Sequence, residues 1–155
     1  MKNIYKSLTT LLSGNNEEQT TPTTFIDIDT SDAREPQAVD DGEYKIRITG
    51  YNKDKDGNII RTGDSGNRYF IVNFDIPDEE FSKGLSQIFS LPGPDTDAKR
   101  LNSIKWSLEC FKKCFGVVDL DLNALLNKEG WALVIKTNDP VYGEQNKIKK
   151  FITGA

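Results

Sequence analysis

Tyrosines and basic residues recur at predicted strand and loop positions of this chain. Tyr51, Tyr69 and Tyr142 fall at outward strand positions or at the edges of loops. Rings in such places can stack on nucleobases, while neighbouring cations contact phosphates. Tyrosine is also common on strands for packing reasons alone. The cations that we expect to accompany these rings as phosphate contacts are Arg47, Arg61, Arg68, Lys136 and Lys147.

Signals for catalysis or metal binding are weak. The chain has no histidine, which excludes histidine triads, histidine ligands and histidine bases. Residues 52–59 (NKDKDGNI) resemble the start of a calcium loop, but Gly63 stands where such a loop needs a bidentate Glu. The Asp-Gly pair within this stretch is typical of a hairpin turn. Cys110 and Cys114 are one helical turn apart, which is poor geometry for a disulfide and too few ligands for zinc. We therefore expect no enzyme activity, no cofactor and no metal.

Charge is divided unevenly along the 155 residues, whose net charge is −4. Residues 1–41 hold eight carboxylates and three cations, so the rest of the chain is close to neutral. Ile4, Leu8, Leu11 and Leu12 have helical spacing, and a polar linker follows them. The sequence therefore predicts a flexible acidic segment with a short amphipathic helix over residues 1–40, and one folded domain over 41–155.

Cellular location follows from what the chain contains. No apolar run approaches the roughly 20 residues that span a bilayer, and the first residues are too polar for a secretion signal. Two cysteines without such a signal indicate a reducing compartment. We expect a cytoplasmic protein with no membrane partner.

The elements that must position these side chains form a recognisable order. Alternation and capping signals predict three strands, a helix beginning at Asp95 or Thr96 and ending at Phe115, and two further strands. This is the element order of the five-stranded OB barrel, an all-β fold with a helix between its third and fourth strands. Its binding loops would be 52–67 and 138–144. The strands are predicted at 44–48, 68–76, 85–91, 131–137 and 146–153, with a short second helix at 121–127.

Trp106 is the exceptional residue of the predicted helix. It points about 180° away from the apolar arc that Leu101, Leu108 and Phe111 share. An exposed Trp can anchor a protein partner or stack on a base. We favour coverage by another segment or contact with a protein over base stacking, because the helix of such barrels usually lies away from the ligand face.

Three segments resemble the small OB-fold single-stranded DNA-binding proteins encoded by bacteriophages and prophages. They are residues 41–48 (DGEYKIRI), 69–74 (YFIVNF) and 142–151 (YGEQNKIKKF). The resemblance implies coating of single-stranded DNA in phage replication or recombination, without catalysis, in the host cytoplasm. Many such proteins recruit partners through an acidic carboxyl tail. Here the acidic segment is amino-terminal, so contacts with phage or host replication proteins would use that end.

Other interpretations remain open. The chain could be a structural or interaction module of a phage, an assembly or virion component that uses Trp106 and the amino-terminal helix and binds no nucleic acid. A saccharide-binding barrel would display aromatic rings without phosphate-directed arginines. The amino-terminal helix is also a candidate for self-association of the chain into a homo-oligomer.

Overall fold

The computed structural model describes residues 24–154. The helix predicted near the amino terminus lies outside these residues. Residues 24–33 are exposed and contain no helix or strand, and a compact unit begins at Arg34. No helix among the described residues has both the length and the apolar character needed to cross a membrane.

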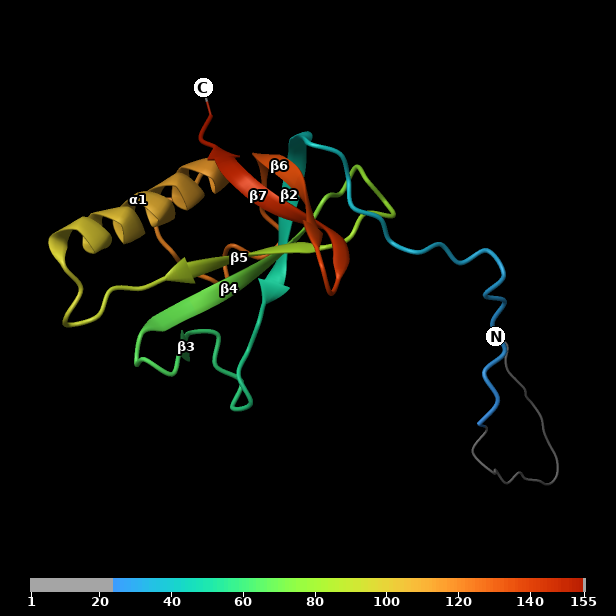
Figure 1. Ribbon diagram of the computed structural model, residues 1–155, viewed down its shortest axis with the longest axis horizontal. Coiled ribbons are helices and arrows are strands. Elements are labelled where there is room, and N and C mark those ends of the chain that lie inside the picture. Colours follow the sequence, from blue (N-terminus) through green and yellow to red (C-terminus); the bar gives the residue numbers. More distant parts are fainter. Residues whose placement is uncertain (1–23, 155) are drawn as a thin grey trace. The chain divides into compact units, whose positions relative to one another are not determined.

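The compact unit is mainly β structure with one helix, as the sequence predicts (Figure 1). Its six strands form an antiparallel sheet in which β4 pairs with β5 on one side and with β2 and β3 on the other. β2 continues to β6, and β6 to β7. The elements are β2 (Gly42–Tyr51), β3 (Arg61–Thr62), β4 (Arg68–Asp75), β5 (Leu85–Ser90), α1 (Ala98–Phe115), β6 (Glu129–Asp139) and β7 (Gly143–Ile152).

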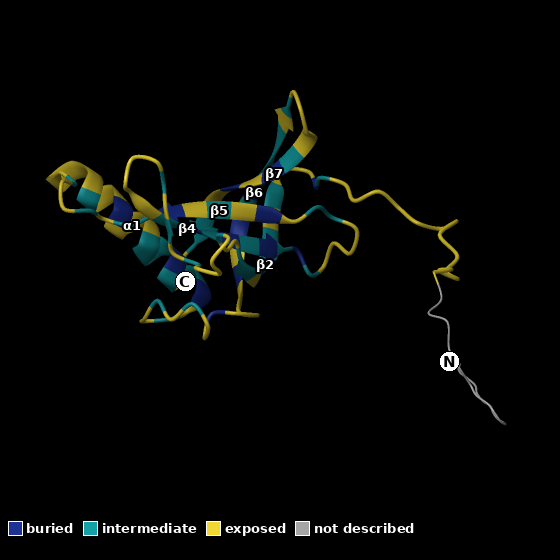
Figure 2. Ribbon diagram, turned by 90° about the horizontal axis from the view of Figure 1, so that it is seen from below, coloured by how far each residue is buried: buried dark blue, intermediate teal, exposed yellow. Residues whose placement is uncertain are grey.

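Alternation along the strands separates a core face from an outward face. Phe70, Val72 and Phe74 of β4 are buried, and the residues between them point outward. β5 alternates in the same way, with Leu85 and Phe89 buried, and Figure 2 shows the change of colour along it. The two strands together therefore present one accessible face.

The helix begins and ends at clear capping residues. Asp97 is its N-cap and accepts a hydrogen bond from the Arg100 amide at 2.8 Å, so the helix starts later than the Asp95 or Thr96 we expected. Gly116 ends the helix in the left-handed conformation, with φ of 68°. Ile104, Phe111 and Phe115 are buried on its inner side.

An aromatic cluster joins the helix to the sheet. The ring centroid of Phe111 lies 4.7 Å from that of Phe89 on β5 and 5.7 Å from that of Phe151 on β7. Phe70 extends the cluster along β4, 5.3 Å from Phe89. Each such pair contributes about 0.5–1.5 kcal/mol beyond the area it buries, so α1 is firmly attached across β5 and β7.

The expected closed barrel is wrong, because the sheet is open. β5 and β7 lie near each other but form no hydrogen-bonded ladder. The backbone just before β5 pairs instead with Gln37, which donates to Phe81 O and accepts from the Lys83 amide, each at 2.9 Å. The arm 37–41 at one end and the phenyl ring of Phe111 at the other therefore lie where a barrel would need β5 to meet β7.

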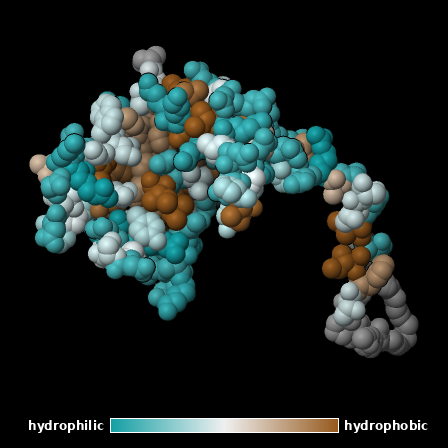
Figure 3. Space-filling model, in the orientation of Figure 1, coloured by the Kyte–Doolittle hydropathy of each residue, from teal (hydrophilic) through white to brown (hydrophobic). Residues whose placement is uncertain are grey.

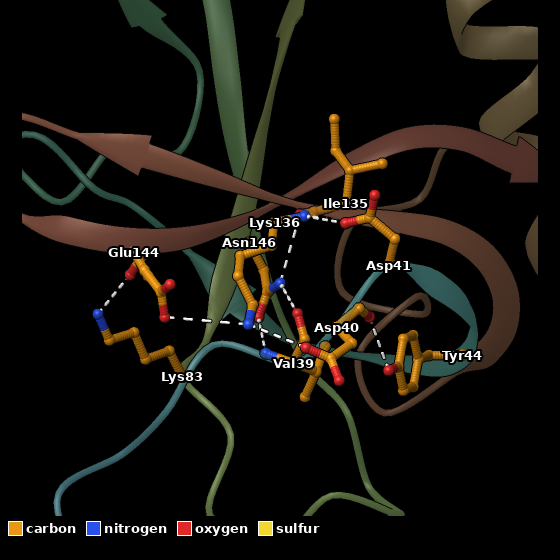
Figure 4. A network of polar contacts seen from close by, with 9 residues as sticks. All are labelled: Val39, Asp40, Asp41, Tyr44, Lys83, Ile135, Lys136, Glu144 and Asn146. Atoms are coloured by element: carbon orange, nitrogen blue, oxygen red, sulfur yellow. Dashed lines mark hydrogen bonds and ion pairs between the residues drawn. The ribbon is translucent and has the colours of Figure 1, made fainter.

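Asn146 attaches this arm to β7 (Figure 4). Asn146 is the only polar side chain that is buried among the described residues. Its Oδ1 accepts from the Val39 amide at 2.8 Å, and its Nδ2 donates to Val39 O at 2.9 Å and to Ile135 O at 3.3 Å. The Lys136 ammonium adds an ion pair to Asp40 at 2.9 Å.

The second helix predicted at 121–127 is not formed, and these residues make turns. The end of this segment forms hydrogen bonds with β2 instead. The Asn127 amide donates to Ile48 O at 2.8 Å, and the carbonyl of the next residue, Lys128, accepts from the Ile48 amide. Asn127 takes a positive φ of 69°, which a helix cannot contain. Leu125 remains buried, so the apolar spacing reflects packing rather than helix.

Candidate nucleic-acid interface

The outward residues of β4 and β5 form an accessible platform, which we call the β4–β5 face. Cross-strand pairing places Tyr69 beside Ser90, Ile71 beside Ile88, and Asn73 beside Ser86. Ile88 is 59% exposed, which is unusual for a large apolar side chain on a strand. The face thus combines one ring, an apolar pair and small polar groups: Tyr69, Ile71, Asn73, Ser86, Ile88 and Ser90.

A cation lies next to the ring of this face. Arg61 of β3 is paired with Tyr69 in the sheet, and its guanidinium carbon is 5.7 Å from the ring centroid. This is within the range of a cation–π contact. A methyl group built at Gly63 would lie 3.6 Å from the Tyr69 ring, so a small residue there leaves the ring accessible from the loop side. Arg68 begins β4 and is exposed.

The connection 52–67 is organised by Asp54. Its Oδ1 accepts hydrogen bonds from the Asp56 and Asn58 amides, both at 2.9 Å. These bonds, the one from Asn58 first, hold the pKa of Asp54 below its usual value. The carboxylate therefore builds a turn in the loop that resembled a calcium site. Within residues 24–154 no group of three or more potential ligands could hold a metal ion.

The β6–β7 turn exposes the second tyrosine. Asp139 Oδ1 accepts from the Val141 and Tyr142 amides at 2.8 and 2.9 Å, which lowers the pKa of this carboxyl. Tyr142 is 73% exposed at the tip. A ring on a rigid turn can meet a ligand with little loss of conformational entropy.

Two of the expected phosphate contacts already have carboxylate partners. Arg47 forms a bidentate ion pair with Asp75 across β2 and β4, and this hydrogen bonding raises the pKa of Arg47. Lys136 bonds to Asp40, which raises its pKa, and lies 3.9 Å from Glu144. Lys147 is exposed on β7. Arg61, Arg68 and Lys147 are therefore better placed than Arg47 and Lys136 to meet phosphates.

Tyr51 points toward the interior rather than outward. Its hydroxyl donates to Leu122 O at 2.7 Å, and the ring packs against the core. Burial raises the pKa of Tyr51 to about 12, with a smaller effect from the charge of Asp121. The structure thus brings Arg61 and Tyr69 together, leaves Tyr142 at a separate tip, and gives Tyr51 a place in packing.

We expect Tyr51→Phe to lower the free energy of unfolding by about 1 kcal/mol through the lost hydrogen bond, without changing nucleic-acid affinity. Because the folded pKa is raised from 10.0 to about 12, the wild-type advantage is complete below pH 10 and is lost as pH rises toward 12. Urea unfolding of both proteins at several pH values measures this. Weaker binding by a normally folded variant would instead place Tyr51 at the interface.

Sequence reasoning missed the β5 half of the platform. Ser86, Ile88 and Ser90 alternate with Leu85, Gln87 and Phe89, and the apolar members of that second set, Leu85 and Phe89, are buried. This alternation is the signal in the sequence that could have identified the outward residues. For Trp106 the sequence favoured coverage by another segment or contact with a protein. The side chain is 64% exposed among the described residues, and the amino-terminal segment that could cover it lies outside them.

Comparison with protein-family models finds no match for the chain. Comparison with curated proteins finds no significantly similar sequence.

Proposed function

We propose that this protein binds single-stranded DNA without strong sequence preference, on the β4–β5 face, and coats it during phage replication or recombination. The strand order β5-β4-β2-β6-β7 supports an OB-type fold, which is a partly open five-stranded Greek-key barrel. In that fold, oligonucleotides bind over the second and third strands, which correspond here to β4 and β5.

The observation that carries the proposal is the pairing of Arg61 with an accessible Tyr69 ring on this face. Stacking on an aromatic ring tolerates any base, since every base has a π-face. Ile71 and Ile88 extend the platform with apolar surface, and Ser90 offers a hydroxyl. The arrangement suits a flexible strand whose bases are not paired.

Local charge decides whether an acidic chain can bind a polyanion. Arg61 pairs with Tyr69 of the face, Arg68 is exposed at the start of β4, and Lys147 is exposed on β7. Each phosphate neutralised on single-stranded nucleic acid contributes a slope of about −0.7 to the dependence of log affinity on log salt. Three contacts give a slope of about −2.

The competing function, an assembly or interaction module, has one observation in its favour. Val141 and Val118 are 79% and 82% exposed, and base stacking has no use for them. Apolar side chains such as these can be buried against a protein partner. This alternative predicts a stable complex with protein and no salt-sensitive DNA binding.

Fluorescence anisotropy with labelled oligothymidylate, and with a duplex of equal length, tests the proposal over a series of salt concentrations. We expect tight binding to the single strand, weaker binding to the duplex, and a slope that Arg61→Gln together with Arg68→Gln reduces by about 1.4. Lys128→Gln, an exposed cation away from the face, is the matched control. Absence of binding, or equal affinity for duplex, refutes the function.

A further inference from the structure

Two adjoining grooves lie beside the β4–β5 face, between α1, β5 and β7. The first has a volume of about 200 Å³ and includes Ile88, Ser90, Arg100 and Ser107. The second has a volume of about 430 Å³ and includes Ser107, Trp106, Lys149 and Lys150. Because both contain Ser107, we treat them as one surface and call it the seam groove. Figure 3 shows apolar side chains gathered near the position that β5 has in Figure 1.

The seam groove is continuous with the proposed binding face. Ile88 and Ser90 line the first groove and are also the β5 members of the β4–β5 face. The second groove follows the line where β5 and β7 do not pair with each other, and Gln87 and Phe151 are among the residues that line it. An extended chain lying on Tyr69 therefore has an uninterrupted surface from β5 to β7.

The charge of the seam groove matches a polyanion. Its lining includes Arg100, Lys149 and Lys150, and neither groove is lined by an Asp or Glu. The pocket beside the arm has the opposite character, since Asp78, Glu79 and Glu80 line it. Although the net charge of the chain is −4, carboxylates thus line the pocket beside the arm and do not line the seam groove.

Trp106 supplies the second ring of this surface. Its side chain is 64% exposed and lines the groove that contains Lys149 and Lys150. A ring next to cations is the combination that holds single strands, through base stacking and phosphate contact together. The same setting suits a neutral apolar peptide less well, because two lysines would stay unpaired.

We propose that single-stranded DNA bound on the β4–β5 face continues through the seam groove, where one base stacks on Trp106 and Arg100, Lys149 and Lys150 contact phosphates. This inference rests on the proposed function and extends its site across α1. Short oligonucleotides occupy the β4–β5 face alone, and longer ones reach Trp106.

Tryptophan fluorescence tests this path directly. The chain has two tryptophans, and Trp131 lies on β6 outside the groove lining. Trp131→Phe therefore leaves Trp106 as the reporter. Titration with oligothymidylates of about 4 and about 16 nucleotides spans the range of site sizes for such folds. We expect the longer oligomer to quench Trp106 emission, and the shorter one to bind without quenching.

Substitutions supply the second readout in the same background. Trp106→Ala should weaken binding of the longer oligomer about 5- to 150-fold and leave the shorter one unchanged, and Trp106→Phe should restore most of the affinity. Lys149→Gln with Lys150→Gln should act in the same direction. Lys113→Gln, on α1 but outside the groove lining, is the control.

Two outcomes overturn the inference, and they differ in meaning. If the longer oligomer binds while Trp106 emission and the affinity of Trp106→Ala stay unchanged, the seam groove is not on the DNA path and the β4–β5 site stands. If neither oligomer binds the parent protein, the proposed function fails and this extension fails with it.

Discussion

Replacing Tyr69 by Ala should weaken binding of oligothymidylate by about 1–3 kcal/mol, which is about 5- to 150-fold in Kd. Tyr69 is the ring of the β4–β5 face and is paired in the sheet with Arg61. Its removal takes away both the stacking surface and the partner of the guanidinium. Anisotropy titration at one fixed salt concentration measures the change.

Two controls separate stacking from a change in fold. Tyr69→Phe keeps the ring and should bind within about twofold of the parent protein. Because Tyr69 is an outward residue, the alanine variant should unfold at nearly the same urea concentration. If a folded Tyr69→Ala protein binds as tightly as the parent, the β4–β5 face is not the site.

Replacing Asn146 by Ala should lower the free energy of unfolding by about 2–4 kcal/mol. The amide makes three hydrogen bonds to backbone groups in a buried place, two of them to Val39. Each backbone group left unpaired costs about 1–3 kcal/mol, which relaxation partly offsets. Urea unfolding followed by far-ultraviolet circular dichroism gives the value.

The neighbouring residue provides the matched control. Lys147 is exposed on the same strand, and Lys147→Ala should change stability by less than about 0.5 kcal/mol. The Asn146 variant should also become sensitive to proteolysis around the arm, residues 37–41, because the arm loses its attachment to β7 through Val39. An unchanged unfolding midpoint for Asn146→Ala contradicts this role.

Local patterns account for most of the elements. The alternation around Phe70 and Phe74 predicts β4, and the apolar arc containing Phe111 predicts α1, because each signal depends only on which residues neighbour one another along the chain. Closure of the sheet is different. It depends on whether β5 and β7 pair, and that outcome is decided by distant partners such as Gln37 and Asn146.

The site shows the same division. Alternation correctly places Tyr69 outward. The prediction that Tyr51 points outward is wrong because a bulge between Ile48 and Gly50 shifts the register of β2. A shift of one residue turns every later side chain to the other face. The ion pair between Arg47 and Asp75 also cannot be predicted from a local pattern, because it joins residues of two different strands.

The most direct test of the binding face is photochemical crosslinking to an oligonucleotide that carries 5-iodouracil, followed by mapping of the modified residue by mass spectrometry. A base stacked on the ring of Tyr69 is in contact with it, so we expect the major crosslink within β4 at Tyr69. A crosslink that maps instead beside Asp78–Glu80, or anywhere remote from β4, β5 and the seam groove, contradicts the account.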